Sequence, residues 1–282
     1  MKLSFLPLLI LTAAIVPFAQ GCIIGQCDNG AANCTQFEPA TRFEEPAKTS
    51  SAAYVAGQGV RVSSINGNVK VTIGATDKVE VSYVGFVLDK KTNETGARSQ
   101  IDSNLVVDVS TVGNDVVIKS SRKSGSSSSL GADITVKLPQ AFSGAFDIDE
   151  QNGEVTADIG AASAVSTRVV NSGAGGVSVV GARGAITVSA DVGDVIVGIS
   201  AWGKGGENGT IKSGNGDITL TVPAAADGQL VLTADGKITV GTTPATWTKV
   251  ETATSKAFTM GAGAGAHLDV TNDFGDIALT VQ

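Results

Sequence analysis

The chain has 282 residues, of which 42% are hydrophobic and 5% aromatic, and it carries a formal net charge of −7. The acidic balance argues against nucleic acid as a partner, because phosphate recognition needs clustered Lys and Arg. The 35 glycines and the scarcity of aromatic residues indicate an all-β protein of short strands and tight turns rather than helices.

Residues 1–21 have the pattern of a secretory signal peptide. Lys2 gives a short positive start, an apolar run follows, and small residues precede the expected cleavage point. The run contains Pro7 and Pro17 and is too short for a comfortable membrane span. We therefore expect a protein exported from the cytoplasm.

The segment Ala19-Gln20-Gly21-Cys22 resembles the lipobox of bacterial lipoproteins. Ala19 and Gln20 depart from that family, which usually has Leu and then Ala or Ser at these positions. The resemblance implies that Cys22 becomes the lipidated first residue, and that the lipid holds the protein on a membrane. Ile23 follows the Cys instead of Asp, which by resemblance to enteric sorting rules implies the outer membrane. The alternative is ordinary cleavage after Gly21 and a freely secreted protein.

The three cysteines all lie before residue 35. An odd thiol is awkward in an oxidising compartment. If Cys22 is acylated, Cys27 and Cys34 remain as a pair that can form a disulfide. A metal site from the three is poorly supported, because their spacing matches no zinc pattern and no histidine lies nearby.

Residues 22–58 read as a flexible tether, since they are polar, contain prolines and show no sustained period. Alternating apolar residues typical of strands begin at about Gly59 and continue over 59–282. Two loops interrupt the first part, at residues 88–100 and in the serine-rich stretch 120–131.

From residue 146 a phrase recurs in which a glycine precedes alternating apolar residues. Successive glycines are 22, 9, 9, 23, 20 and 39 residues apart, which clusters near a unit of about 20 residues, half of it or twice it. The glycines of this series are Gly153, Gly175, Gly184, Gly193, Gly216, Gly236 and Gly275. This period predicts a single-stranded β-solenoid (β-helix) whose coils stack their apolar residues. The predicted inward column consists of Val155, Val177, Ile186, Val195, Ile218, Ile238 and Ile277.

A β-sandwich is the alternative, because Asn-Gly and Asp-Gly between alternating strands are also the best short hairpin signal. In either fold the repeated phrase is expected to serve the fold rather than a ligand. In the segment 213–223, Gly216 should turn the chain, Ile218 and Leu220 should point inward, and Thr219 should point outward.

The segments "VKLPQAFSGAFDIDEQNGEVTADIG" and "NGTIKSGNGDITLTVPAAADGQLVLTADGKITVG" resemble a family of bacterial putative-adhesin domains of unknown function. The resemblance covers roughly residues 59–282. It implies an envelope-exposed β-solenoid without a catalytic motif.

Carboxylates are the main candidates for chemistry. Asp147 and Asp149 should share one face of a strand, about 7 Å apart. Such a pair can bind calcium or act in glycoside hydrolysis, but it is more often a solvated outer face. Asp217 and Asp276 follow glycines without continuing into the nonapeptide arrays of calcium-binding β-rolls.

The remaining candidates are single residues. His267 is the only histidine, so any catalytic triad would depend on it alone. Trp202 and Trp247 are the only tryptophans, and each can serve as a sugar platform or as a structural cap. The run "GAGAGA" at 261–266 lacks the strand–loop–helix context of a phosphate-binding loop.

Two function classes follow. The favoured one is a non-enzymatic envelope lipoprotein that binds a glycan or a surface protein, or has a structural role. The alternative is a β-helical carbohydrate-active enzyme, a polysaccharide lyase or hydrolase, which needs converging acid and base groups. We expect no catalytic residues, no metal and no cofactor.

Overall fold

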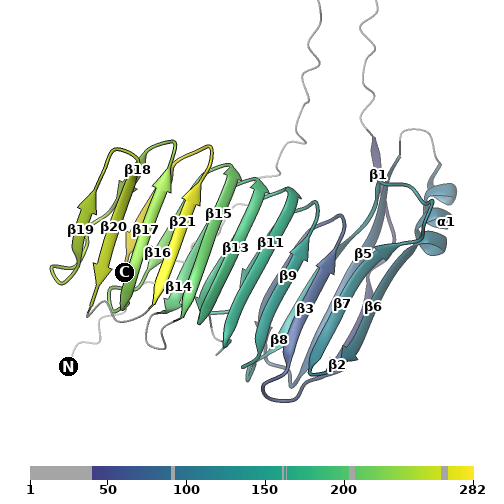
Figure 1. The fold of residues 1–282 in the computed structure, drawn as a ribbon. Coiled ribbons are helices and arrows are strands. Elements are labelled where there is room, and N and C mark those ends of the chain that lie inside the picture. The colour runs from purple at the N-terminus through teal and green to yellow at the C-terminus, as the bar shows by residue number, and fades with distance from the viewer. Residues whose placement is uncertain (1–39, 90–92, 161, 163, 203–206, 262–265) are drawn as a thin grey trace, which may run out of the picture. The chain divides into compact units, whose positions relative to one another are not determined.

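Two β-sheets account for most of the residues that the structure describes (Figure 1). The structure is a computed structural model that describes residues 40–89, 93–160, 162, 164–202, 207–261 and 266–282. All of them belong to one unit, Ala40–Gln282. The predicted signal peptide, Cys22, Cys27 and Cys34 lie outside the described residues, so lipidation and the disulfide remain predictions.

Each sheet has 11 strands. Sheet A runs in the order β1 (Thr41–Glu44), β5 (Lys78–Asp89), β8 (Leu130–Pro139), β4 (Val69–Gly74), β10 (Val155–Asp158), β12 (Val177–Arg183), β14 (Val195–Ala201), β16 (Ile218–Val222), β22 (Ile277–Val281) and β18 (Ile238–Val240), with β2 (Lys48–Ala53) also paired to β5. Sheet B runs in the order β19 (Thr248–Glu251), β20 (Ser255–Met260), β17 (Gly228–Ala234), β21 (His267–Asn272), β15 (Asn208–Asn215), β13 (Ala185–Val192), β11 (Ser166–Ala174), β9 (Ala145–Glu150), β3 (Gly59–Ser64), β7 (Asp115–Arg122) and β6 (Leu105–Val112). The all-β prediction is therefore confirmed.

In the middle of the molecule the chain alternates between the sheets. Each unit consists of a sheet B strand, a glycine turn and a sheet A strand, as in β9–β10, β11–β12, β13–β14 and β15–β16. Equivalent strands of successive units pair in parallel. The glycine turns therefore carry the chain from one sheet to the other instead of closing antiparallel hairpins. Two layered sheets are consistent with the sandwich alternative.

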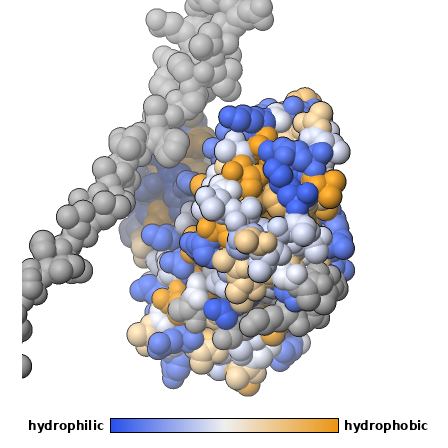
Figure 2. Space-filling view, turned by 90° about the vertical axis from the view of Figure 1, so that its left-hand side faces the viewer, coloured by the Kyte–Doolittle hydropathy of each residue, from blue (hydrophilic) through white to orange (hydrophobic). Residues whose placement is uncertain are grey.

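The order of the units in space differs from their order in the chain at both ends. The β3–β4 unit lies between β7–β8 and β9–β10, and the β21–β22 unit lies between β15–β16 and β17–β18. Outside these units the pairing becomes antiparallel, with β1, β2 and β6 at one end and β19 and β20 at the other. Figure 2 looks onto the second end and shows apolar residues among hydrophilic ones. Antiparallel strands thus close both sheets at the first end and sheet B at the second, where sheet A finishes on the parallel strand β18.

The core lies between the two sheets and is built from alternate residues of each strand. Most of the buried apolar residues join one cluster. All seven members of the predicted inward column are buried. Six of them belong to neighbouring strands of sheet A in register, whereas Ile186 lies in sheet B. Ile218 and Leu220 point inward and Thr219 is exposed, as predicted.

Two regions differ from the sequence-based prediction. The tether predicted for 22–58 contains β1 and β2, so the folded part described by the structure begins at about Ala40 rather than Gly59. β1 and β2 are short strands that are held by pairing with β5. No periodic pattern in their own sequence indicates this pairing. The loop predicted for 88–100 contains the start of helix α1 (Glu94–Asn104).

Helix α1 is stabilised by an N-terminal cap and by two buried side chains. Asn93 caps it by accepting a 2.8 Å hydrogen bond from the Gly96 N–H. Ala97 and Ile101, four residues apart, bury one side against Val87 and Leu130. No helix in the described ranges has the length and hydropathy that a membrane span requires.

Candidate functional site

The glycine turns pack directly against one another, backbone to backbone. Gly216 has φ +145°, and a Cβ built on it would lie 2.4 Å from the carbonyl oxygen of Gly193. Gly193, Gly175, Gly153 and Gly275 meet the preceding turn in the same way, each with positive φ. Backbones pack too closely here for any side chain. The close contact between successive turns therefore explains why the repeated sequence needs glycine at these positions. It also leaves no space between the turns for a ligand.

The acidic residues after these glycines also bond to the backbone. Asp194 Oδ1 accepts a 2.8 Å hydrogen bond from the Asp217 N–H, and Asp217 Oδ1 accepts one of 2.9 Å from the Asp276 N–H. Asp276 Oδ1 in turn accepts from the Lys237 N–H at 2.8 Å. Each carboxylate thus joins its own turn to the next, which agrees with a role in the fold.

A row of buried polar residues runs beneath the turns at the ends of the sheet B strands. Ser64, Glu150, Asn171, Ser213 and Asn272 occupy equivalent positions there, with Ala190 between Asn171 and Ser213. Asn171 Nδ2 donates to the carbonyl oxygens of Gly153 and Gly175, at 2.7 and 2.8 Å. The Asn171 amide therefore provides hydrogen-bond donors to buried carbonyl groups of two successive turns.

Glu150 is the charged member of this row and is 1% exposed. Burial raises the pKa of its carboxyl to about 7, and Asp133 adds to the rise. The nearby Ser64 side chain and the N–H groups of Gln151 and Asn152 oppose the rise. Within the described residues, however, Glu150 Oε2 and Ser64 Oγ make no hydrogen bond of good geometry. The carboxyl therefore titrates near neutral pH.

The candidate pair Asp147 and Asp149 does share the outer face of β9, as expected. Arg168 on β11 lies between them, with its Nη1 at 2.6 Å from Asp147 Oδ1 and 2.8 Å from Asp149 Oδ1. A calcium ion or a scissile sugar would have to displace this guanidinium. The geometry favours a salt-bridged outer surface over an acid–base pair.

The single-residue candidates lie in different parts of the chain's strand order: Trp202 directly after β14, Trp247 directly before β19 and His267 at the start of β21. His267 lies at the surface and its Nε2 is 2.9 Å from Asp269 Oδ1. Trp202 and Trp247 are buried, and Trp247 packs edge-on against Phe258 with ring centroids 6.2 Å apart. Neither indole is available as a sugar platform. Most of the "GAGAGA" run lies outside the described residues.

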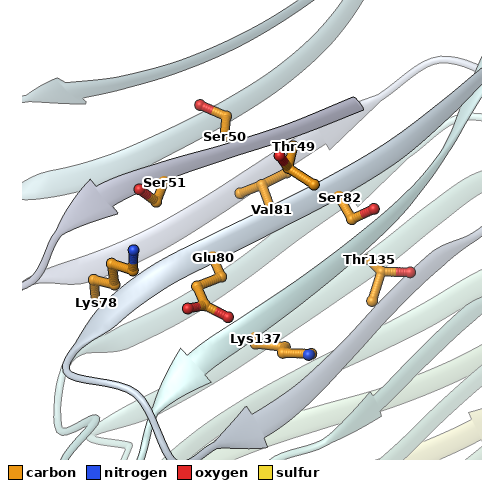
Figure 3. Close-up of a pocket in the computed structure, with 9 residues that line it drawn as sticks. All are labelled: Thr49, Ser50, Ser51, Lys78, Glu80, Val81, Ser82, Thr135 and Lys137. Atoms are coloured by element: carbon orange, nitrogen blue, oxygen red, sulfur yellow. The ribbon is translucent and has the colours of Figure 1, made fainter. Parts of the chain in front are cut away.

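The outer face of sheet A carries the candidate site, which sequence reasoning missed. Here β2, β5 and β8 line a hollow with a volume of about 400 Å³, which we call the β5–β8 hollow (Figure 3). Cross-strand register places Ser51, Glu80 and Lys137 in one row and Thr49, Ser82 and Thr135 in the next. Alternation buries Val81 and Val136 beneath them.

A second hollow of about 320 Å³ adjoins the first and shares Glu80 and Lys137 with it. We call it the β4–β5 hollow, and its walls include Thr72, Ile73 and Thr76. The register Thr72↔Lys137 continues the row of the β5–β8 hollow onto β4. The two hollows therefore form one surface depression across four strands.

The charges in this depression are not neutralised by close partners. Among the described side chains, no ion pair involves Lys78, Lys137 or Glu80. Two ammonium groups and one carboxylate thus face solvent beside several hydroxyls. The sequence shows these residues only as polar members of alternating strands. Their proximity depends on the pairing of β2 with β5.

Comparison with known proteins gives a likeness of fold. No family model matches the sequence, and no curated protein matches it. A putative cell adhesion protein from Clostridium sporogenes ATCC 15579 is similar with a TM-score of 0.49 and 11% identity, over 84% of this chain and 99% of that chain. A putative adhesin from Bacteroides fragilis NCTC 9343 is similar with a TM-score of 0.39 and 12% identity, over 84% of this chain and 98% of that chain. Both scores are below 0.5, so the likeness is coarse.

Proposed function

We propose that this chain is a non-enzymatic lipoprotein of the bacterial cell envelope that presents a β-solenoid for binding or adhesion. A lipid on Cys22 would hold it on the outer membrane, and its partner would be a glycan or a surface protein. The observation that carries the binding role is the depression on the outer face of sheet A. Within the described residues its charged groups make no ion pair, and its hydroxyls make no hydrogen bond except that of Thr76, which bonds to the Lys78 backbone. The acidic residues of the turns, in contrast, bond to the backbone of the next turn.

The coil description is supported by the register of the middle units. Ser166 of β11 pairs with both Ala145 of β9 and Ala185 of β13. Deleting residues 166–184 would therefore bring β13 beside β9 in the same register. A solenoid should tolerate this loss of one coil. We expect the deleted chain to remain soluble and to unfold cooperatively, and an aggregated or unfolded product would contradict the coil description.

The anchor can be tested by metabolic labelling with a fatty acid. We expect the full chain and Cys27→Ala to incorporate the label and Cys22→Ala to lose it. Fractionation of the labelled cells should place the protein with the outer membrane. Equal labelling of wild type and Cys22→Ala would exclude lipidation at Cys22.

The binding role can be tested on whole cells. Cells that make the full chain should attach to a glycan-coated or protein-coated surface more than cells without it, and an excess of the soluble domain should compete. Turnover of a polysaccharide by the purified chain, abolished by Asp147→Ala or Asp149→Ala, would instead establish the carbohydrate-active enzyme. Attachment that is independent of the protein would exclude adhesion.

A further inference from the structure

We propose that the β5–β8 and β4–β5 hollows form one groove that binds a carboxylated saccharide, such as a chain of uronic acid units. This inference rests on the binding role proposed above and names the chemistry of its ligand. Because Lys137 and Glu80 line both hollows, a ligand that fills them must pass over these two side chains. An extended chain of sugar units has the shape that such a double depression fits.

The groove is rich in hydroxyls and lacks aromatic side chains among its lining residues. Thr49, Ser51, Ser82 and Thr135 line the first hollow and Thr72 lines the second, where the Thr76 hydroxyl already bonds to the Lys78 backbone. Hydroxyls both donate and accept hydrogen bonds, which suits the hydroxyls of a sugar. Neutral sugars are commonly bound by stacking on an aromatic face. A ligand recognised here must therefore gain its affinity from polar and charged groups.

The lysines supply the charge that selects an acidic sugar. Lys78 and Lys137 line the first hollow, and Lys70 extends the row beside Thr135 on β4. Glu80 lies between the lysines, and Asp77 and Asp158 lie at the margins of this face. The protein as a whole has a net charge of −7, so long-range attraction does not favour anions. Binding must come from local pairing of ammonium groups with carboxylates, while Glu80 accepts from sugar hydroxyls.

The groove is built on a rigid part of the sheet. β8 carries Thr135 and Lys137 and is paired on both sides, with β5 and with β4. The strand backbone therefore holds these side chains at fixed spacing before a ligand arrives, which lowers the entropy lost on binding.

Calorimetry on the purified full chain with three polymers tests the proposal. Polygalacturonate carries carboxylates, dextran is neutral, and dextran sulfate carries charge of a different geometry. We expect polygalacturonate to bind and dextran not to bind. The double variant Lys78→Ala/Lys137→Ala should weaken polygalacturonate binding at least about tenfold, while Lys78→Arg/Lys137→Arg should retain most of it. Lys119→Ala removes an exposed strand lysine on sheet B and is the matched control.

The outcomes separate the two proposals. If polygalacturonate does not bind, or if the double alanine variant binds it as well as wild type, the groove is not the site. If dextran sulfate binds equally well and Lys119→Ala weakens binding as much as the double variant, the interaction is general charge attraction and the proposal fails. Cell attachment that survives in the double alanine variant would overturn this ligand while leaving the adhesive role intact. Unchanged thermal unfolding of the variants confirms that a loss of binding is local.

Discussion

The middle of the molecule and its two ends are built by different rules. From β9 to β16 each unit pairs in parallel with its sequence neighbours, and one set of turn residues recurs. At the ends the pairing is antiparallel, a helix appears, and units that are distant in sequence lie side by side. The middle is therefore specified by local repetition, whereas the ends depend on long-range pairing. The difference predicts which substitutions lower the stability of several units and which disturb only their own surroundings.

The largest effect is expected at the glycine turns of the middle. Gly216→Ala places a Cβ 2.4 Å from the Gly193 carbonyl oxygen at a φ of +145°, and we expect a loss of about 4 kcal/mol or more in the free energy of unfolding. Gly113→Ala is the matched change in an end hairpin, with φ +60° and open space around the Cβ. It should cost about 1 kcal/mol. Urea denaturation of both variants checks this, and equal losses would remove the distinction between middle and end.

The next effect concerns the buried column of sheet A. Ile218 pairs with strands on both sides, whereas Ile238 lies on the edge strand β18. Ile218→Ala should cost about 2–5 kcal/mol because a cavity opens between packed units, and Ile238→Ala should cost less. Thr219→Ala, on the outer face, should stay within about 0.5 kcal/mol. If Thr219→Ala proves the most damaging in chemical denaturation, the assignment of inner and outer faces is reversed.

A pH effect is expected where the middle meets the first end. The pKa of Glu150 is raised from 4.5 to about 7 in the folded protein, so the folded state binds the proton more tightly than the unfolded state. Stability should therefore fall as pH rises from about 4.5 to about 7, by about 3 kcal/mol, and then level off.

Glu150→Gln should remove this part of the pH dependence and be more stable than wild type above about pH 7. Glu154→Gln changes an exposed carboxyl four residues away and should keep the slope. Thermal unfolding followed between pH 4 and pH 8 provides the measurement. A slope that persists in Glu150→Gln would show that another group is responsible.

A smaller effect than that at Glu150 is expected for the carboxylates that join successive turns. Asp217 accepts the Asp276 N–H at an exposed position, so Asp217→Ala should cost about 1 kcal/mol. Asp217→Asn keeps an acceptor oxygen and should recover most of it. A larger loss in calcium than in calcium-free buffer would contradict a purely structural role, since it would reveal a bound ion at this corner.

The sequence predicts the middle well because its information is local. A glycine that needs positive φ and a valine or isoleucine two residues later recur in each unit, so the inward positions can be named without a structure. Ile186 is buried as predicted but lies in sheet B, outside the sheet A column, because its glycine precedes a strand of sheet B at half the repeat. The 39-residue step from Gly236 to Gly275 has the length of two units, but it contains the antiparallel pair β19 and β20.

The ends and the candidate groove could not be predicted from local patterns. β2 has the sequence KTSSAA, which shows no period, and becomes a strand only through β5. Lys137 and Ser51 are far apart in the chain and reach one row through two antiparallel pairings. The buried row under the turns was missed because its members are Ser, Glu and Asn, which are usually exposed.

The insertion of β21 and β22 beside an earlier unit constrains the order of assembly. β15 and β17 are consecutive strands of sheet B in the chain, yet β21 occupies the place between them, and β22 does the same between β16 and β18. As the chain emerges from a ribosome or a secretion pore, the units up to β16 can stack one after another. β17 and β18 must then wait beside an open slot until the last 16 residues, 267–282, arrive to fill it. Residues 267–282 thus complete both sheets last, because β21 and β22 fill the gaps between strands that are already made. A chain cut short before residue 267 should leave the edges of these strands unpaired and prone to aggregation.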